Sequence, residues 1–377
     1  MRIFIEADSI ATDRISGIGH ATLEIIKAIS KLIDGSEHSL TIIVPYGKRL
    51  KVKSYAFKNV LVKTLPPAYR YVNYLFVRTS IPFPVDALFG KGVYIFPNYK
   101  TWFLSRSRSL TFVHDVAYKI LPETTNPANL RYLRKNMKTW LSRADKVLTI
   151  SESSKKDILN FFPEVKSKLE VVYLGVNKKD YRPRSPNEVR SILKKYGLDD
   201  DYFLYLGNIE PRKNIENLLI AYKEYADSVQ KPLQMVLVGG GGWNDDSIKN
   251  RMKLLTREGY NIFKPKDYVV DTDLPALYTG ARALVHVSLH EGFGLSLLQA
   301  QACGTTIIAS NLEVFKETLD NKNVIYVDGK NVQTISRAMV TVSKETKDKN
   351  IPSVPKHTWE QTAKELLSLA GIMVNSK

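Results

Sequence analysis

The feature that most constrains the fold of this chain is an alternation of short β-rich runs with helical segments, which occurs in two successive series. Strands that alternate with helices form parallel sheets with helices on both faces. Two such series predict an α/β fold of two doubly wound, parallel-sheet domains. The predicted strands are 2–7, 40–44, 60–65, 93–96, 110–113, 146–150 and 170–173 in the first series, and 202–206, 234–238, 268–270, 283–287 and 306–309 in the second. The predicted helices are 18–32, 130–142 and 153–161, then 215–228, one that ends at 258, two that begin at 274 and 294, and a last one over 359–369 after a proline-marked turn.

A polar, proline-bearing stretch separates the two series. It reads NKKDYRPRSP over 177–186, a composition typical of a linker. The 377 residues are too many for one ordinary hydrophobic core and suit two. We therefore expect one domain over 1–180 and a second over 181–358. Ligands of open α/β sheets bind at the carboxyl ends of the strands, so the expected site is a cleft across which the two domains face each other.

The composition indicates a protein of a reducing compartment. Cys303 is the single cysteine, so no internal disulfide can form. No run approaches the ~18 uncharged apolar residues of a membrane span. The opening MRIFIEADSI contains two acids and is predicted to be a strand rather than a signal peptide. We expect a cytoplasmic protein.

The net charge of +17 is concentrated in the first half of the chain. Residues 1–180 contain 29 Lys and Arg against 15 Asp and Glu, which leaves 26 against 23 for the remainder. Such a basic half attracts anions, and an anionic membrane surface is one expected partner. A solvated face that only maintains solubility explains the charge equally well. Nucleic acid is disfavoured, because no zinc-finger, RNA-recognition or basic-zipper pattern is present.

Two polar motifs lie at strand ends in the first half. In SGIGH (16–20), Gly17 and Gly19 would let backbone N–H groups approach a phosphate at a helix N-terminus, and a plain glycine loop is an equal alternative. His114 and Asp115 follow the strand predicted at 110–113. A neutral His114 ring there could bond a sugar hydroxyl or a leaving oxygen, whereas a lone histidine at a strand end is more often structural.

Two further motifs follow strands of the second half. In LGNIEPRKN (206–214), Arg212 and Lys213 stand just before a helix, an arrangement that suits a diphosphate whose charge grows as a sugar leaves. An exposed basic turn is the alternative. Four glycines at 239–242 permit close backbone approach, and without a following Gly-Lys-Ser/Thr they are no triphosphate loop.

The most telling motif is HEGFGL at 290–295, which leads into a helix. Backbone N–H groups beside the glycines would face an anion, while the Glu291 carboxylate would accept hydrogen bonds from hydroxyls. Asp271 and Asp273 form an Asp-x-Asp pattern that could bind a divalent metal. Because Leu274 and Pro275 follow directly, an N-cap at Asp273 is the preferred interpretation.

The ordered set of segments resembles the retaining glycosyltransferases of family 4, which have the GT-B fold, over nearly the whole chain. The segments are SGIGHATLEIIKAI, FVHDVAY, ADKVLTISESSKKDI, YLGNIEPRKNIENLLIAY, VLVGGGGW, DLPALYTGARALVHVSLHEGFGLSLLQAQACGTTIIAS and HTWEQTAKELL. FVHDVAY looks like bacterial mannosyltransferases of polysaccharide and O-antigen assembly. The resemblance implies a GT-B fold whose last helix, about 359–377, packs back on the N-terminal domain.

The resemblance also implies roles for single residues. Arg212 and Lys213 would hold the donor diphosphate in place of a metal, Glu291 would contact the transferred sugar, and His114 would lie near the reacting carbon. The nucleotide base would lie near 268–270. The other residues expected to bind the donor are Gly17, Gly19, Asp115, Gly207, Asn208, Tyr268, Val269, Phe293, Gly294, Leu295 and Gln299. Gln299 is a departure, because the family carries its second carboxylate there; its amide can still accept and donate hydrogen bonds.

The expected function is retaining, metal-independent transfer of a hexose from a nucleotide diphosphate sugar, with GDP-mannose as the first choice of donor and no cofactor. The expected acceptor is a glycan, or one linked to a polyprenyl diphosphate, at the inner face of the plasma membrane. The donor is expected to bind the C-terminal domain, and the acceptor to enter from the basic N-terminal domain. The sequence shows no convincing nucleophile, which favours front-face attack. A catalytically weak sugar-nucleotide-binding or scaffold subunit is the alternative that Gln299 permits. A Rossmann oxidoreductase is disfavoured, because the glycine pattern is incomplete.

Overall fold

The computed structural model describes residues 1–12, 15–67, 83–243, 245–345, 352 and 355–371, and its main chain forms two compact units. The first unit comprises 1–116, 131–175 and 357–377, and the second comprises 117–130 and 176–356. The domain limits expected from the sequence, 1–180 and 181–358, remain a prediction. Each unit contains one sheet in which every strand pairing is parallel.

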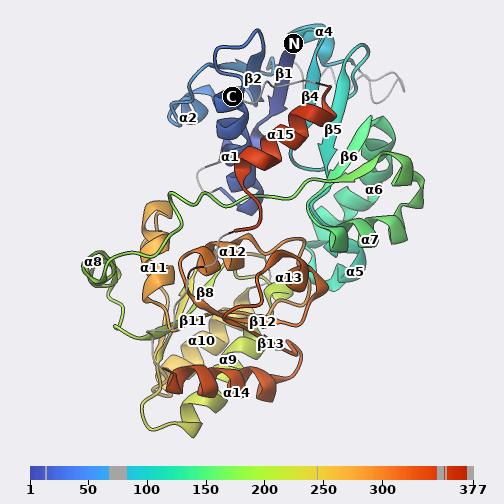
Figure 1. Cartoon of the computed structure of the whole chain (residues 1–377). Helices are drawn as coiled ribbons and strands as arrows, with labels where there is room; N and C mark the ends of the chain where they lie inside the picture. Colours follow the sequence, from blue (N-terminus) through green and yellow to red (C-terminus); the bar gives the residue numbers. More distant parts are fainter. Residues whose placement is uncertain (13–14, 68–82, 244, 346–351, 353–354, 372–377) are drawn as a thin grey trace. The chain divides into compact units, whose positions relative to one another are not determined.

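The first unit is built on a seven-stranded sheet of order β3-β2-β1-β4-β5-β6-β7 (Figure 1). Its strands are β1 (Arg2–Glu6), β2 (Ser39–Val44), β3 (Val60–Thr64), β4 (Val93–Phe96), β5 (Arg108–Phe112), β6 (Lys146–Thr149) and β7 (Leu169–Val171). The α-helices are α1 (Gly17–Leu32), α2 (Arg49–Lys53), α4 (Asp86–Phe89), α6 (Pro127–Arg143), α7 (Glu152–Phe161) and α15 (Trp359–Leu369), with 3-10 turns η1 (Asp8–Ile10) and η3 (Pro163–Lys168).

The second unit is built on a six-stranded sheet of order β10-β9-β8-β11-β12-β13. Its strands are β8 (Tyr202–Leu206), β9 (Gln234–Val238), β10 (Ile262–Phe263), β11 (Ala283–His286), β12 (Thr306–Ser310) and β13 (Val324–Val327). The α-helices are α5 (Ala117–Ile120), α8 (Pro186–Tyr196), α9 (Ile215–Ser228), α10 (Asp246–Arg257), α11 (Leu274–Gly280), α12 (Leu295–Ala302), α13 (Glu313–Thr318) and α14 (Val332–Lys344), with 3-10 turns η2 (Pro122–Thr124), η4 (Pro211–Lys213) and η5 (Asp271–Asp273).

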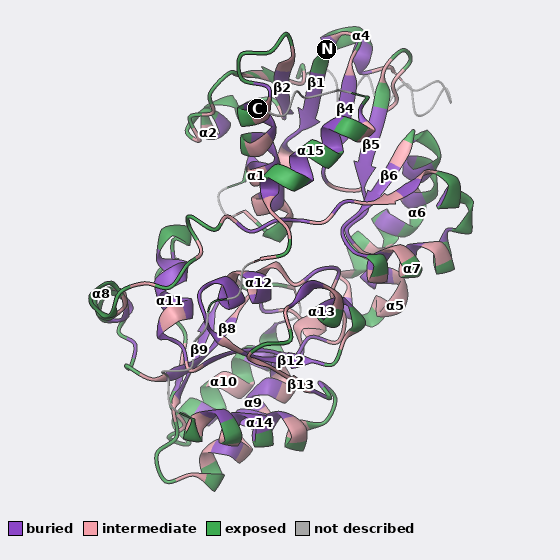
Figure 2. Cartoon of the chain, in the orientation of Figure 1, coloured by how far each residue is buried: buried purple, intermediate pink, exposed green. Residues whose placement is uncertain are grey.

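The central strands of both sheets are buried because helices cover them (Figure 2), whereas the edge strand β3 has no buried residue. In the second unit, α9 packs against α10 and α14, while α11 packs against α8 and α12. The core under α9 is rich in aromatic side chains that include Phe203, Tyr222 and Tyr225. Within the described part of the chain, no helix combines the length and apolar character that crossing a bilayer requires.

The C-terminal helix α15 belongs to the first unit and packs against α1. Thr358 and Gln361 form a capping box at its start. The Thr362 hydroxyl donates to the Tyr173 carbonyl (2.7 Å), and a side chain at Gly175 would lie 2.1 Å from the Trp359 nitrogen. A glycine is therefore required at position 175, where the segment that follows β7 passes close to the backbone at the start of α15. Residues 372–377 of the helix expected at about 359–377 lie outside the described residues.

Two details of the expected secondary structure are wrong, and helix α8 was not predicted. The strand expected at 268–270 is irregular chain, and the strand that pairs with β9 is instead Ile262–Phe263. Two residues are enough to form β10 because they pair with β9. Helix α8 begins at Pro186, at the end of the expected linker, where Ser185 and Glu188 form a capping box. Asp273 occupies the N-cap position of α11 without capping it, since its carboxylate accepts from Lys195 Nζ (2.6 Å) and the Tyr196 hydroxyl (2.7 Å).

Candidate functional site

The best-defined polar cluster lies at the point where the second sheet reverses its strand order. β8 lies between β9 and β11, so the loops that leave β8 and β11 emerge side by side and run in opposite directions around the sheet. Such a switch point is the usual ligand site of an open α/β sheet. The Leu289 N–H donates to the Arg212 carbonyl (2.9 Å), which joins the two loops directly.

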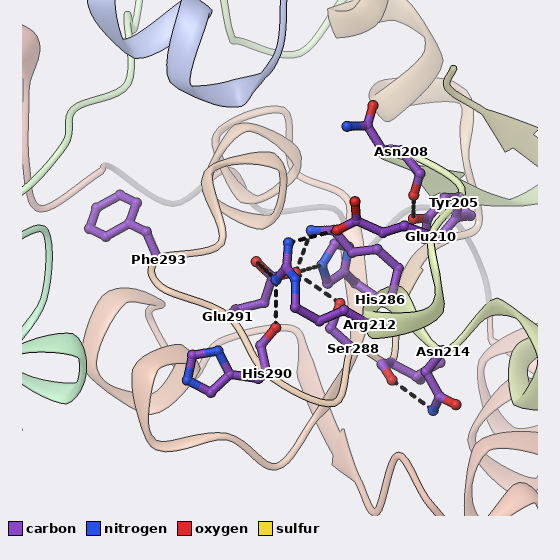
Figure 3. Close-up of polar contacts among 12 residues, drawn as sticks. Tyr205, Asn208, Glu210, Arg212, Asn214, His286, Ser288, His290, Glu291 and Phe293 are labelled. Atoms are coloured by element: carbon purple, nitrogen blue, oxygen red, sulfur yellow. Dashed lines mark hydrogen bonds and ion pairs between the residues drawn. The ribbon is translucent and has the colours of Figure 1, made fainter. Parts of the chain in front are cut away.

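The Glu291 carboxylate is the centre of this cluster (Figure 3). Its Oε1 accepts from Lys213 Nζ at 2.5 Å, from the Ser288 hydroxyl at 2.9 Å and from His286 Nε2 at 3.0 Å. Its Oε2 lies 3.2 Å from an Arg212 nitrogen. The fold thus brings together the predicted residues Arg212, Lys213 and Glu291. Lys213 and Glu291 are 78 positions apart in the sequence.

The electrostatics of the cluster keep Glu291 ionised and His286 neutral. Burial by itself would raise the pKa of Glu291, but the adjacent Lys213 and Arg212 outweigh it and hold that pKa well below its usual range. Burial lowers the pKa of His286, and the nearby cations add to this against the opposing effect of Glu291. Two carboxylates, Glu291 and Glu210, balance the two cations, so an anion that binds here competes with these carboxylates for Arg212 and Lys213.

Arg212 is held by further partners. It donates to the Glu210 carboxylate (2.8 Å) and to the His290 carbonyl (2.7 Å), so the protein itself fixes the orientation of its guanidinium. The Asn208 carbonyl accepts from the Tyr205 hydroxyl (2.7 Å), and Gly207, with φ of 153°, starts the turn. The predicted residues Gly207 and Asn208 therefore shape the loop that carries Arg212 and Lys213.

The glycine run after β9 supports that loop by close backbone contact. A side chain at Gly239 would lie 1.9 Å from the Gly207 carbonyl oxygen, and one at Gly242 would lie 2.4 Å from the Ile209 carbonyl oxygen. The Ile209 N–H donates to the Gly240 carbonyl (3.0 Å). The run is thus a packing surface for the 207–213 loop, which explains two of its glycines without a ligand.

The start of α12 contains the next group of predicted residues. Gly294 is the N-cap in the left-handed region (φ 88°), and a side chain there would lie 2.8 Å from the Phe315 ring. Leu295 is the first helical residue, while the Phe293 side chain is buried and points away from the Glu291 cluster in Figure 3. Gln299 Oε1 accepts from the Tyr278 hydroxyl (3.2 Å), so this face of its amide is engaged inside the protein.

Tyr268 and Val269, the residues predicted to lie near the base, are in irregular chain before η5. The Tyr268 side chain is half-exposed and Val269 is buried. The Val270 N–H points to the Tyr196 hydroxyl (3.4 Å), which anchors this stretch to α8. Their role in binding a base stays a prediction.

Gly17 and Gly19 lie at the start of α1 in the first unit, and they differ. A side chain at Gly19 would lie 2.7 Å from the Ser9 carbonyl oxygen and 2.9 Å from Ile15 Cβ, so packing accounts for this glycine. Nothing lies within 4 Å of a side chain added at Gly17. Packing therefore leaves Gly17 unexplained, and its predicted place beside a phosphate stays open to test.

His114 is buried at the end of β5, and its ring has a fixed orientation. Its Nε2 lies 2.6 Å from the Pro97 carbonyl oxygen, which can only accept, so Nε2 carries the proton. Burial lowers the pKa of His114 despite the neighbouring Asp115. The remaining Nδ1 can accept a bond from a sugar hydroxyl, but a neutral ring in this tautomer cannot donate to a leaving oxygen. The structure thus favours one of the two expected contacts.

The sequence interpretation missed three side chains of interest. His286 and Ser288 bind Glu291, and Glu6 at the end of β1 is buried, with burial and the nearby Asp8 raising its pKa to about 8. Each of the three lies at or just beyond the carboxyl end of a strand. A polar residue at the carboxyl end of a predicted strand, the feature that led to His114, would also have indicated these three side chains.

The region around the Glu291 cluster matches a known family. The family model described as Glycosyl transferases group 1 matches residues 189–353, which lie within the second unit. The matched region includes Arg212, Lys213 and Glu291.

Two curated proteins of O-antigen assembly are similar to this chain. O-antigen chain mannosyltransferase B of Escherichia coli is 35% identical over 230 residues, which are 61% of this chain and 59% of that protein. O-antigen chain mannosyltransferase RfbU of Salmonella typhimurium is 28% identical over 271 residues, which are 69% of this chain and 66% of that protein. The chain thus spans less than two thirds of the length of these relatives. The expected resemblance to bacterial mannosyltransferases is confirmed.

Solved glycosyltransferase structures share the fold. HepE of Anabaena in complex with UDP and glucose superposes with a TM-score of 0.69 over 99% of this chain and 96% of that chain, at 16% identity. At this identity the likeness concerns the fold alone. It confirms the predicted GT-B fold of two doubly wound parallel-sheet domains.

Proposed function

We propose that this chain, which has the GT-B fold and resembles bacterial mannosyltransferases, is a glycosyltransferase that moves a hexose from a nucleotide diphosphate sugar. The observation that carries the proposal is the placement of Arg212, Lys213 and Glu291 together at the switch point of the second sheet. Two directed cations suit the donor diphosphate, and a carboxylate held among them suits the hydroxyls of the sugar.

GDP-mannose is the first choice of donor. The support for mannose is the similarity to proteins named mannosyltransferases, while HepE, which was solved with UDP and glucose, supports a nucleotide-sugar donor in general. The proposed transfer needs no cofactor and no metal, because Arg212 and Lys213 neutralise the departing diphosphate in the role that a metal would otherwise have.

The proposed step retains the anomeric configuration. The bond between the sugar C1 and the diphosphate oxygen breaks, and its electron pair goes to that oxygen, where Arg212 and Lys213 stabilise the charge. The acceptor hydroxyl forms the new C1–O bond from the same face and gives its proton to the departing phosphate. Neutralisation of charge that develops only in the transition state raises the rate rather than merely the affinity.

The proposed acceptor is a glycan, or one linked to a polyprenyl diphosphate, in cell-surface polysaccharide biosynthesis, and the proposed location is the inner face of the plasma membrane. The segment 45–65 of the first unit supports this location, since it contains six basic residues and no acid. It also exposes Leu50 (81%) and Tyr46 (67%) around the short helix α2. Cations beside exposed apolar side chains suit anionic headgroups above an acyl layer.

The alternative of a silent binding or scaffold subunit is not favoured. It was permitted by Gln299 in place of a carboxylate, but the two O-antigen proteins similar to this chain are named as mannosyltransferases. Gln299 retains an amide that accepts from Tyr278, so the position is still polar and ordered.

Transfer by the purified full chain tests the proposed activity. A panel of nucleotide sugars is first compared by thermal shift, because a bound donor raises the midpoint of unfolding. We expect GDP-mannose to give the largest shift and to support transfer to a polyprenyl-diphosphate-linked glycan, with the α-configuration of the donor kept in the product. Binding of nucleotide sugars with neither transfer nor donor hydrolysis would favour the scaffold alternative.

Sedimentation with vesicles tests the proposed location. We expect binding to vesicles with anionic lipid at low salt and release at high salt, because the Debye length shortens to about 3 Å at 1 M. Leu50→Asp should weaken this binding. The matched control is Leu88→Asp, which changes another exposed leucine of the first unit outside the 45–65 segment. Equal binding to zwitterionic vesicles, or no effect of salt, contradicts the proposal.

A further inference from the structure

His286 occupies an aromatic slot that does not require an imidazole. Its ring is almost fully buried, stacks on the Tyr205 ring (centroids 6.1 Å apart) and meets the Phe315 ring edge-on (5.9 Å). A phenylalanine ring would fill the same space with the same two contacts. Packing therefore explains an aromatic residue at the end of β11, but it does not explain a histidine.

The hydrogen bonds of His286 fix its protonation. Nε2 lies 3.0 Å from Glu291 Oε1, while Nδ1 is buried and has no hydrogen-bond partner. An ionised carboxylate only accepts, so the proton must be on Nε2. The opposite tautomer would bury an unsatisfied Nδ1–H and turn a lone pair toward the carboxylate. The ring is thus a neutral donor with one unsatisfied acceptor, a state that is unfavourable for folding.

The donors to Glu291 divide into two kinds (Figure 3). Lys213 and Arg212 are cations, and they are also the groups that a diphosphate would attract. His286 and Ser288 are neutral, lie at the end of β11 and just beyond it, and bind the same oxygen, Oε1. When a diphosphate draws the cations toward itself, the neutral donors are the ones that remain with the carboxylate.

We propose that His286 is a positioning residue, which holds the Glu291 carboxylate in place through its Nε2–H while Arg212 and Lys213 engage the donor diphosphate. Ser288 shares this role from the adjoining loop. The inference rests on the proposed function, in which Glu291 contacts the transferred sugar. It adds a residue that the sequence motifs did not indicate, and it explains why the chain retains an imidazole with an unsatisfied nitrogen.

Two substitutions at the same position test the role. His286→Phe keeps the ring and removes the donor, so we expect the midpoint of thermal unfolding to be unchanged or higher. We expect its kcat to fall about tenfold or more, as is common when a residue that orients a functional side chain is lost, with little change in the donor KM. His286→Gln places an amide donor near the Nε2 position and should recover part of kcat.

Controls separate positioning from a merely structural role. His38→Phe makes the same change in the first unit, where His38 meets the N-terminal amine, and should leave transfer unchanged. Ser288→Ala combined with His286→Phe should lower kcat by more than the product of the single effects, since Glu291 then keeps no neutral donor. A wild-type kcat in His286→Phe, or equal losses in the Phe and Gln variants, overturns the inference.

A spectroscopic measurement decides the inference even if the proposed function fails. The imidazole nitrogen-15 spectrum of the full-length wild-type chain is recorded with and without GDP. We expect His286 to show a protonated Nε2 and an unprotonated Nδ1 in both. An absence of transfer by the wild-type chain refutes the proposed function. Loss of the Nε2–H signal, or protonation of Nδ1 when GDP is added, refutes the positioning role.

Discussion

The two sheets reverse their strand order in the same way, yet the chemistry at their switch points is opposite. In the second unit, between β8 and β11, a buried carboxylate is ionised and surrounded by Lys213 and Arg212. In the first unit, between β1 and β4, the buried Glu6 has a pKa raised to about 8 by burial and by Asp8. The nearby His114 is also held neutral.

The difference shows that the sheet topology determines where each polar site lies, whereas the side chains determine the charge of that site. The second switch point offers an anion two directed cations, Arg212 and Lys213, whose charge Glu210 and Glu291 balance. The first is built of groups that are neutral or can share a proton, which suits hydroxyls better than phosphates. This difference in charge agrees with the expectation that the donor diphosphate binds the second unit and the acceptor enters from the first.

Removing both cations of the second switch point should have the largest effect. In Arg212→Ala with Lys213→Ala, we expect transfer to fall about a thousandfold or more, because each charge-stabilising donor is worth about 10²–10³ in kcat. Loss of the partners of a buried carboxylate should also lower the free energy of unfolding by about 3–5 kcal/mol. Transfer and the free energy of unfolding are both measured, so that a variant that fails to fold is distinguished from one that folds but does not transfer.

The control for that double variant is Arg190→Ala with Lys194→Ala on the exposed face of α8. It removes the same formal charge from the same unit and should retain full transfer. Wild-type transfer in the Arg212 and Lys213 variant would refute the assignment of the donor diphosphate to this cluster.

Glu6 should give the first switch point a pH dependence of stability that Glu291 does not give the second. A carboxyl with a folded pKa of about 8 and an unfolded value of 4.5 binds its proton more tightly when folded. Its contribution is complete below pH 4.5, falls as pH rises and is lost above about pH 8. Since one pKa unit is worth about 1.4 kcal/mol, the change should amount to a few kcal/mol.

Chemical denaturation of Glu6→Gln between pH 4.5 and pH 8 measures this contribution. The slope of the unfolding free energy in this range should flatten relative to the wild-type chain. Glu291→Gln should leave the slope unchanged, because the depressed pKa of Glu291 confines its effect to pH below 4.5. Identical slopes in wild-type and Glu6→Gln chains would mean that Glu6 is ionised in the folded protein at neutral pH.

The smallest expected effect compares two glycines at the start of α1 in the first unit. Gly19→Ala places a methyl group against the Ser9 carbonyl and Ile15, so we expect a loss of about 1–3 kcal/mol in unfolding free energy. Gly17→Ala meets open space and should change stability by less than about 0.5 kcal/mol. If Gly17 approaches a phosphate, this variant should still lose transfer. Full activity in Gly17→Ala would remove Gly17 from the site.

The sequence predicted elements best where the local signal was strong. β4, β8, β9 and α9 have the predicted limits, because apolar runs specify them locally. β10 was misplaced and β13 was not predicted, because two- to four-residue strands depend on the neighbour with which they pair. Asp273 had the sequence context of a cap, yet Lys195 and Tyr196, distant in sequence, bind its carboxylate instead.

By itself, the sequence determined that this protein has two doubly wound sheets and that Arg212, Lys213 and Glu291 stand at strand ends. Only the tertiary structure decided how these residues are used: that Glu291 takes four donors, that His286 is one of them, and that Glu6 is buried beside Asp8. The physical reason is that a periodic pattern is encoded locally. Lys213 reaches Glu291 from 78 positions away, and even near neighbours such as His286 and Ser288 contact Glu291 only through the way their loop folds.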